Sequence, residues 1–203
     1  NRRIADMEDS SFRSLRQAAE KRAELLKTDC DFLSRSLSKE WDNMRDVDKL
    51  VVLRIMVDEK HCDVEQTLFF LIKLMVSPDS YYRYEALNYI AQIDGNNQRN
   101  FLIKVVLNDP DLGNRNRALL LLADIFHNQE DEEILRLALS VYDDSGSTTE
   151  SRLIAGAAMM FQWGIAGGED NRPAFWNEDE DELAHPLIQK AVTQTRNLLY
   201  QSD

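Results

Sequence analysis

A 32-residue internal repeat is the feature that most limits how this chain can fold. Two successive segments between residues 64 and 125 share residue types at matched spacing, including a turn proline, the aspartate after it and an arginine four residues later. Residues Phe69, Met75, Pro78, Asp79, Arg83, Ala86, Leu87, Ala91 and Ile93 of the first segment correspond to Phe101, Leu107, Pro110, Asp111, Arg115, Ala118, Leu119, Ala123 and Ile125 of the second. Such a period predicts stacked helical units, because one unit cannot bury its apolar face alone.

Each repeat is predicted to hold two helices. Residues 64–76 are apolar nearly all round, which is typical of a helix packed on several sides. Ser77-Pro78-Asp79 ends that helix and supplies a cap for the next one, which is expected over residues 81–93 and ends at Asp94-Gly95. The chain has only 7 glycines and 4 prolines, which agrees with a fold that needs few tight turns.

The sequence after the repeat continues this pattern with less regularity. A third unit is expected at an offset of 35 residues, with one helix over residues 130–142 and a second capped by Thr148 or Thr149. Residues 167–186 have no helical period and are predicted to form a long loop. The chain closes with a predicted helix over residues 187–200.

The sequence before the repeat is also helical in pattern. Residues 12–44 carry apolar side chains three or four positions apart, with Thr28 or Asp29 available as an interior cap. Asp46 or Asp48 can cap the helix that follows. The chain is therefore expected to form one all-α domain. Its predicted parts are N-terminal amphipathic helices (1–46), helical repeats (47–165), an acidic loop (167–186) and a capping helix (187–201).

The turn between the helices of the second unit resembles that of a HEAT-like repeat of the PBS-lyase type. Those repeats contain an Asp-Pro-Asp turn, then an arginine, then a helix of small residues, and Asp109-Pro110-Asp111 with Arg115 fit that pattern. Asp109 precedes Arg115 by six residues, the separation that these repeats use for an aspartate–arginine ladder between neighbours. The resemblance covers residues 47–165 and departs from the pattern at Ser77, which replaces the aspartate, and in the third unit, which lacks the proline.

The resemblance implies an architecture. It implies a right-handed α-solenoid of antiparallel helix pairs, in which the second helix of each pair lines a concave surface. It does not imply a particular activity, because function resides in sites placed on a fold.

Negative charge is concentrated at the C-terminal end. The chain has 24 Lys+Arg and 36 Asp+Glu, a net charge of −12. Residues 129–203 hold 15 acidic and 5 basic side chains, so this segment carries −10. Binding to a phosphate backbone depends on lysine and arginine, so nucleic acid is not an expected partner. A negative surface of this kind favours a basic protein partner.

The chain has two cysteines, Cys30 and Cys62, and no C-x-x-C pair. Cys30 falls on a helical apolar stripe and Cys62 at the end of an apolar segment, so packed thiols are favoured over a bridge. A reducing cytoplasm is therefore expected, although an export signal could precede the first residue. No apolar run reaches the roughly 18 residues that span a membrane, so no membrane partner is expected.

A tyrosine cluster over residues 81–89 is the best candidate for a contact surface. The repeat register points Ala86, Ile90 and Ile93 inward, which places the residues between them on the outer side. The partner-binding residues predicted on the repeats are Tyr81, Tyr84, Glu85, Asn88, Asn116, Arg117, Leu120 and Asp124. Tyrosine offers a large rigid face and a hydroxyl group at low entropic cost. The alternative is that two of the tyrosines bridge adjacent repeats.

The acidic loop is the second candidate. Its predicted partner-binding residues are Phe175, Trp176, Glu178, Asp179, Glu180, Asp181 and Glu182. An aromatic anchor flanked by carboxylates can dock on a basic surface, to which long-range attraction steers it. The alternative is a solvated surface loop. The spacing does not match the calcium-binding loop of an EF-hand.

The sequence gives little support to catalysis. His61, His127 and His185 all lie near predicted helix ends, which favours capping or exposure over metal binding. No hydrolase, phosphate-loop or dinucleotide motif is present. HEAT-like DNA glycosylases combine aromatic and acidic residues in an electropositive groove. Trp163, Arg115, Arg117 and Asp124 are residues of those types, but the acidic balance of the chain opposes DNA binding.

The sequence therefore predicts a non-enzymatic protein-binding scaffold with no catalytic residues, cofactor or metal. A bacterial toxin-immunity protein and an adaptor within a larger assembly are two forms that it could take. The competing hypothesis is an enzyme on the same scaffold, such as a DNA glycosylase or lyase.

Overall fold

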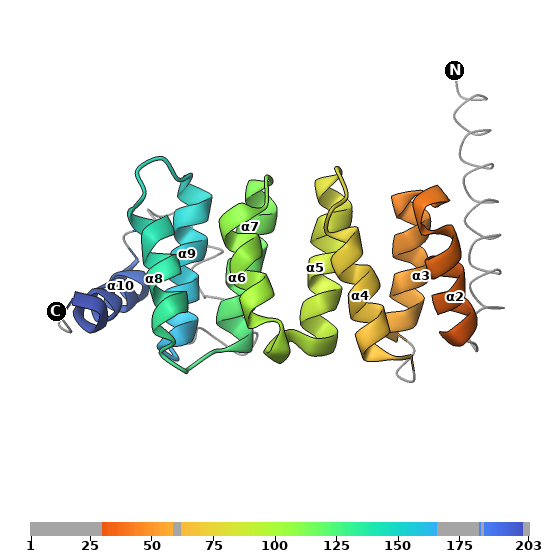
Figure 1. Cartoon of the computed structure of the whole chain (residues 1–203). Helices are drawn as coiled ribbons and strands as arrows, with labels where there is room; N and C mark the ends of the chain where they lie inside the picture. Colours follow the sequence, from red (N-terminus) through yellow and green to blue (C-terminus); the bar gives the residue numbers. More distant parts are fainter. Residues whose placement is uncertain (1–29, 59–61, 166–182, 184, 201–203) are drawn as a thin grey trace, which may run out of the picture. The chain divides into compact units, whose positions relative to one another are not determined.

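The computed structural model is all-helical over the residues it describes, which are 30–58, 62–165, 183 and 185–200 (Figure 1). The prediction of an all-α chain is confirmed there. The chain divides into two compact units, Asn1–Ile93 and Asp94–Asp203. We call them unit 1 and unit 2.

Unit 1 is built from helices that pack around leucine side chains. Its elements are α2 (Cys30–Glu40), a 3-10 turn η1 (Trp41–Asn43), α3 (Asp46–Asp58), α4 (Val64–Leu74) and α5 (Ser80–Asp94), whose last residue begins unit 2. Helix α2 packs on α3 and α4, and α3 packs on α4. Trp41 closes one side of this core by stacking on Phe70, with ring centroids 5.4 Å apart. The ammonium groups of Lys49 and Lys73 lie 4.9 and 5.0 Å from the centre of the tryptophan ring.

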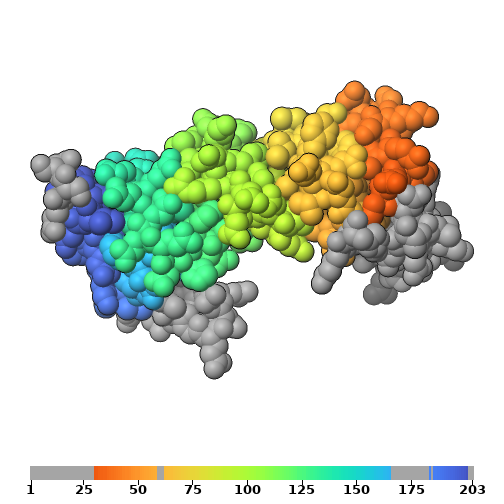
Figure 2. Space-filling model, turned by 60° about the horizontal axis from the view of Figure 1, so that its bottom comes forward, coloured from red at the N-terminus to blue at the C-terminus, as the bar shows by residue number. Residues whose placement is uncertain are grey.

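Unit 2 contains η2 (Gly95–Asn97), α6 (Arg99–Asn108), α7 (Leu112–Ile125), α8 (Glu132–Asp143), α9 (Thr149–Gln162) and α10 (Pro186–Tyr200). Helix α6 packs on α7, α7 on α9, and α8 on α9, while α10 contacts both α8 and α9. In the space-filling view α10 (blue) lies directly against the teal surface of α8 (Figure 2). Helix α9 is buried on nearly every side, because three other helices contact it.

Side chains cap the helices close to the predicted positions. Thr148 accepts a hydrogen bond from the Ser151 amide and so caps α9, as predicted. Asp79 accepts from the Tyr81 amide at the start of α5, which confirms the cap expected from the turn. Helix α3 begins at Asp46, so Asp46 and Asp48, one of which was expected to cap it, lie in its first turn. The Arg45 carbonyl oxygen accepts from the Asp48 and Lys49 amides there.

The two turns of the 32-residue repeat make the same local contacts. Arg83 Nη1 donates to the Ser77 carbonyl oxygen at 2.8 Å, and Arg115 Nη1 donates to the Asp109 carbonyl oxygen at 2.8 Å. The third unit differs, because its longer turn lets Arg152 Nε donate to the carbonyl oxygen of Tyr142. The repeat seen in the sequence is therefore matched by a repeated arginine-to-turn contact in its first two units.

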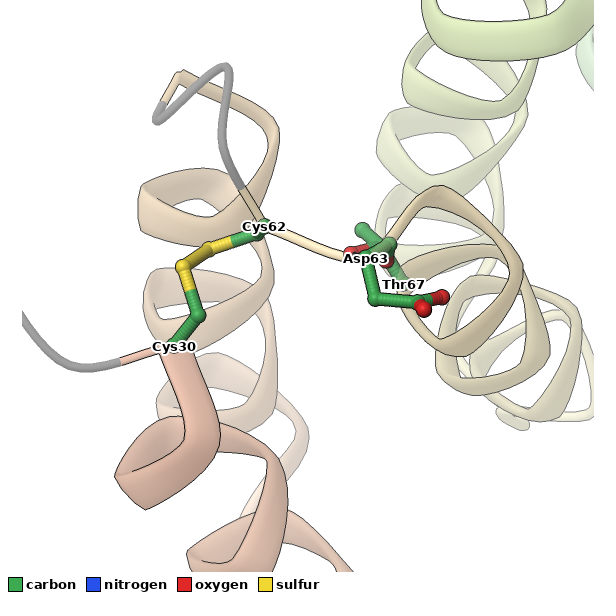
Figure 3. The surroundings of a disulfide bond; sticks show 4 residues. All are labelled: Cys30, Cys62, Asp63 and Thr67. Carbon is green, nitrogen blue, oxygen red and sulfur yellow. Dashed lines mark hydrogen bonds between the residues drawn. A yellow bond between two sulfur atoms is a disulfide. The ribbon is translucent and has the colours of Figure 1, made fainter.

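A disulfide joins Cys30 to Cys62, so the prediction of two packed thiols is wrong (Figure 3). The chain runs out along α2 and back along α3, which returns Cys62 to the start of α2 and leaves the two Cα atoms 5.3 Å apart. The separation of 32 residues gives no sign of this, because the return depends on the packing of α2 on α3. A disulfide that closes a loop of this length lowers the entropy of the unfolded chain, and this stabilises the folded state by about 3–4 kcal/mol. The expectation of a reducing cytoplasm rested on unpaired thiols and loses that basis.

An ion-pair network ties α6 to the start of α8 in unit 2. Arg99 donates to both carboxylate oxygens of Asp131, at 2.7 and 2.8 Å through Nη2, and to Glu133 at 2.7 Å. Asp131 also caps α8 by accepting from the Ile134 amide. Partial burial alone would raise the pKa of Asp131, but the hydrogen bonds from Arg99 and the amides outweigh it, so this pKa is lowered.

We predict that Asp131→Asn lowers the free energy of unfolding by about 1–3 kcal/mol at pH 7, because asparagine keeps the cap but loses the charge. A lowered folded-state pKa adds stability above the unfolded value of about 4, and this stability is lost as the pH falls through the folded value. Urea unfolding from pH 7 to pH 2 should show the gap to the wild type closing in acid. Asp111→Asn, at the cap of α7, is the matched control with a smaller expected effect. A gap that does not depend on pH would contradict this prediction.

Helix α10 lies close to α9 at Gly156. A Cβ atom at this position would lie 2.8 Å from Cγ2 of Ile188, which is fully buried. We predict that Gly156→Ala destabilises the protein by about 1–3 kcal/mol, because the buried isoleucine must shift. Thermal unfolding measures this. Gly146→Ala on the exposed turn after α8 is the control, and equal melting temperatures for the two variants would show that α10 adjusts freely.

Candidate protein-binding surface

Helix α5 presents tyrosine side chains to solvent. Tyr81 is 57% exposed and Tyr84 is 37% exposed, while Ala86 and Ile90 on the opposite side are fully buried. The predicted inward positions are thus confirmed for these two residues, and Ile93 is half-buried. Glu85 and Asn88 lie half-buried along the outer side.

Helix α3 also carries exposed valines. Val47 and Val51 are both exposed and lie four positions apart, so they share one side of α3 with Arg54. Tyr89 of α5 interacts electrostatically with Arg54 of α3, and Tyr82 of α5 interacts with Arg45, the residue before α3. Burial raises the pKa of Tyr89, which agrees with its half-buried side chain.

These two exposed helix sides form what we call the α3–α5 face. It consists of Val47, Val51, Tyr81, Tyr84, Glu85 and Asn88. The Tyr81 ring is held in position by an edge-to-face contact with Tyr82, whose ring centroid lies 5.4 Å away. A ring that is already ordered loses little conformational entropy when a partner binds. The sequence did not predict the valines, and only their four-residue spacing among polar neighbours could have indicated them.

The predicted site residues on α7 divide into two groups. Arg117 and Leu120 are half-buried and Asp124 is exposed, so these three lie on the outer side as predicted. Asn116 is only 7% exposed, and its side-chain amide donates to Ser151 Oγ of α9 at 3.0 Å. The prediction that Asn116 lies on the outer side is therefore wrong, because α9 packs against that flank of α7.

The acidic-loop residues Phe175, Trp176, Glu178, Asp179, Glu180, Asp181 and Glu182 lie outside the described residues. Within the described part of unit 2, several acidic side chains already have cationic neighbours. Glu133 pairs with Arg99, and Asp143 accepts from Arg196 at 2.6 Å. Glu130 and Glu150 are exposed at the beginnings of α8 and α9.

Helix α4 differs from its sequence expectation. A helix that is apolar nearly all round was predicted to be packed on several sides, but Phe69 is 60% exposed and Ile72 is also exposed. Val76, just beyond the end of α4, is 82% exposed. The core contacts of α4 come from its opposite side, which includes Phe70, Leu71 and Leu74.

The residues considered for chemistry make contacts inside unit 2. Trp163 Nε1 donates to Thr195 Oγ1 of α10, and Arg115 holds the turn before α7. Trp163 and Arg115 are of residue types that a glycosylase site would need, but here their side chains contact other parts of unit 2. His127 and His185 lie at helix ends, as predicted, and His61 is outside the described residues.

The described residues contain no group of three side chains of the metal-binding types, and no helix among them is long and apolar enough to cross a membrane. Comparison with protein-family models, curated proteins and solved structures finds no match for this chain. The HEAT-like resemblance therefore stays a prediction.

We predict that the exposed and buried site candidates respond differently to truncation. Tyr81→Ser should change the free energy of unfolding by less than about 0.5 kcal/mol, because the side chain is exposed. Asn116→Ala should cost about 1–2 kcal/mol, because it removes a buried hydrogen bond. Chemical denaturation compares the two. A large loss from Tyr81→Ser would show that this tyrosine serves the fold.

Proposed function

We propose that this chain is a non-enzymatic protein-binding module whose partner is a basic protein. The observation that carries the proposal is the α3–α5 face, where two tyrosines and two valines are exposed on helices whose opposite sides form the core. Aromatic side chains on a rigid support are the usual anchors of protein interfaces. An enzyme needs polar groups that converge on a cavity, and the residues suggested for chemistry contact the protein itself.

We further propose that the helix pairs form a HEAT-like α-solenoid. The 32-residue repeat and the matched contacts of Arg83 and Arg115 with their turns support this arrangement. In such a stack α3 and α5 are second helices of unit 1, and α7 is a second helix of unit 2. The α3–α5 face lies on unit 1, and Arg117, Leu120 and Asp124 lie on α7 of unit 2.

The charge of the chain supports a basic partner. Residues 129–203 carry −10, and their field would attract a cationic protein over about a Debye length, roughly 8–10 Å. Attraction of this kind raises the rate of encounter, while the anchors slow dissociation. A toxin-immunity protein and an adaptor both fit this division of roles.

The test is affinity capture from cells of the native organism with variant chains as bait. We predict that the wild-type chain enriches one or a few basic proteins, and that Tyr81→Ser/Tyr84→Ser lowers their yield at least about tenfold, because each lost anchor costs about 1–2 kcal/mol or more. Tyr200→Ser, on the exposed end of α10, is the matched control and should retain the partner.

A salt series separates the two contributions. Raising the salt from 0.05 to 0.5 M should weaken capture by the wild type, because screening removes the long-range attraction. Equal recovery of the same proteins by the wild type and by the double tyrosine variant would overturn the proposal. A partner that is acidic would overturn the role of the charge.

A further inference from the structure

The disulfide connects the two ends of one helical hairpin in unit 1. Cys30 is the first residue of α2, and Cys62 directly precedes Asp63, the cap of α4 (Figure 3). Cys62 is buried and Cys30 is partly exposed, so a soluble thiol reaches the bond more readily from the Cys30 side. These are the two cysteines of the whole sequence.

The bond lies where α4 begins. Asp63 accepts a hydrogen bond from the Gln66 amide at 2.8 Å through its carboxylate, and from Thr67 Oγ1 at 2.7 Å through its carbonyl oxygen. Thr67 is almost completely buried. The disulfide at Cys62 therefore restrains the residue directly before Asp63, the cap of α4. This matters because initiation is the costly step of helix formation.

The bond also anchors α2, which supplies much of the core of unit 1. Leu33 and Leu37 of α2 are buried, and Trp41 directly after α2 stacks on Phe70 of α4. Release of α2 would expose these side chains to water. Unit 1 has only about sixty described residues. The hydrophobic core of a unit this small gives only marginal stability, so a cross-link supplies a large part of the total.

Unit 2 is held by contacts that involve no cysteine. Gln162 of α9 is fully buried, and its side chain accepts from the Asp131 amide and donates to the Phe126 carbonyl oxygen. It joins the ends of α7 and α9 to the start of α8. Reduction of the disulfide leaves all of these bonds in place.

We propose that the Cys30–Cys62 disulfide is a redox-controlled clamp on unit 1. The clamp is closed in an oxidising compartment, where disulfides persist. A small thiol such as glutathione opens it in two steps. The thiolate attacks a sulfur of the bond to give a mixed disulfide and release one cysteine, and a second thiol frees the other. The protein gains two electrons and two protons, and two thiols become one disulfide.

The open form differs from the closed form in unit 1 alone. Helix α2 and the start of α4 lose their fixed packing, while α7, α8 and α9 keep theirs. The α3–α5 face lies on the affected unit, so reduction would also switch off binding, and this last consequence alone rests on the proposed function. The clamp itself needs no partner for its test.

Hydrogen exchange of the full chain, followed by mass spectrometry with and without the phosphine reductant TCEP, tests the clamp. The loss of the cross-link should raise amide exchange in α2 and the first turn of α4 at least about tenfold. Exchange in α7–α9 should change less than about twofold. Unchanged protection of α2 after complete reduction would overturn the proposal, and so would an equal increase in both units.

Fluorescence of Trp41 gives a second readout. The variant Trp163→Phe/Trp176→Phe leaves Trp41 as the one tryptophan, since the chain has three. Reduction should shift its emission to the red and make it accessible to iodide, and reoxidation should reverse both changes. Adding Cys30→Ser/Cys62→Ser to this variant gives the control, whose emission should already be red-shifted and insensitive to TCEP. Emission from the cysteine-free control that matches the oxidised protein would show that unit 1 does not need the bond.

Discussion

The side chain of Arg83 fixes the turn on which the candidate surface depends. Its guanidinium is nearly buried and donates to the carbonyl oxygens of Ser77 and Pro78 at 2.8 and 3.2 Å. A buried charge is costly unless hydrogen bonds compensate it, so these contacts hold the start of α5 in one orientation relative to the end of α4. That orientation sends Ala86 and Ile90 into the core and leaves Tyr81 on the outside. Arg115 repeats the arrangement in unit 2, where α7 leaves Asp124 outside.

Most of the helical architecture could be predicted from the sequence, because its causes are local. Apolar spacing and turn residues placed a helix over 81–93 where α5 covers Ser80–Asp94, and over 187–200 where α10 covers Pro186–Tyr200. The disulfide could not be predicted, because the distance between Cys30 and Cys62 is set by the packing of α2 on α3. The burial of Asn116 could not be predicted either, since the flank it occupies is covered by α9, 35 residues further along the chain at Ser151.

The candidate surface shows the same division between local and long-range causes. The outer position of the α5 tyrosines follows from helical periodicity alone, and the structure confirms it. Val47 and Val51 are exposed on α3, and the pattern of α3 alone does not reveal which of its apolar side chains the neighbouring helices leave uncovered. The exposed Phe69 on α4 shows the reverse problem. Burial of an apolar side chain is energetically favourable, but the arrangement of the neighbouring helices determines whether the side chain is buried.

The lack of space at Gly156 has a consequence for insertions after α9. Helical repeat arrays can grow by duplication of a unit, and each new unit must lie against the helix pair before it. Here α10 contacts α9 so closely that the backbone at Gly156 meets a buried isoleucine, and α10 also contacts α8. A further helix pair inserted after α9 would have to displace α10 from both. Close packing at one glycine therefore limits what can be inserted between α9 and α10.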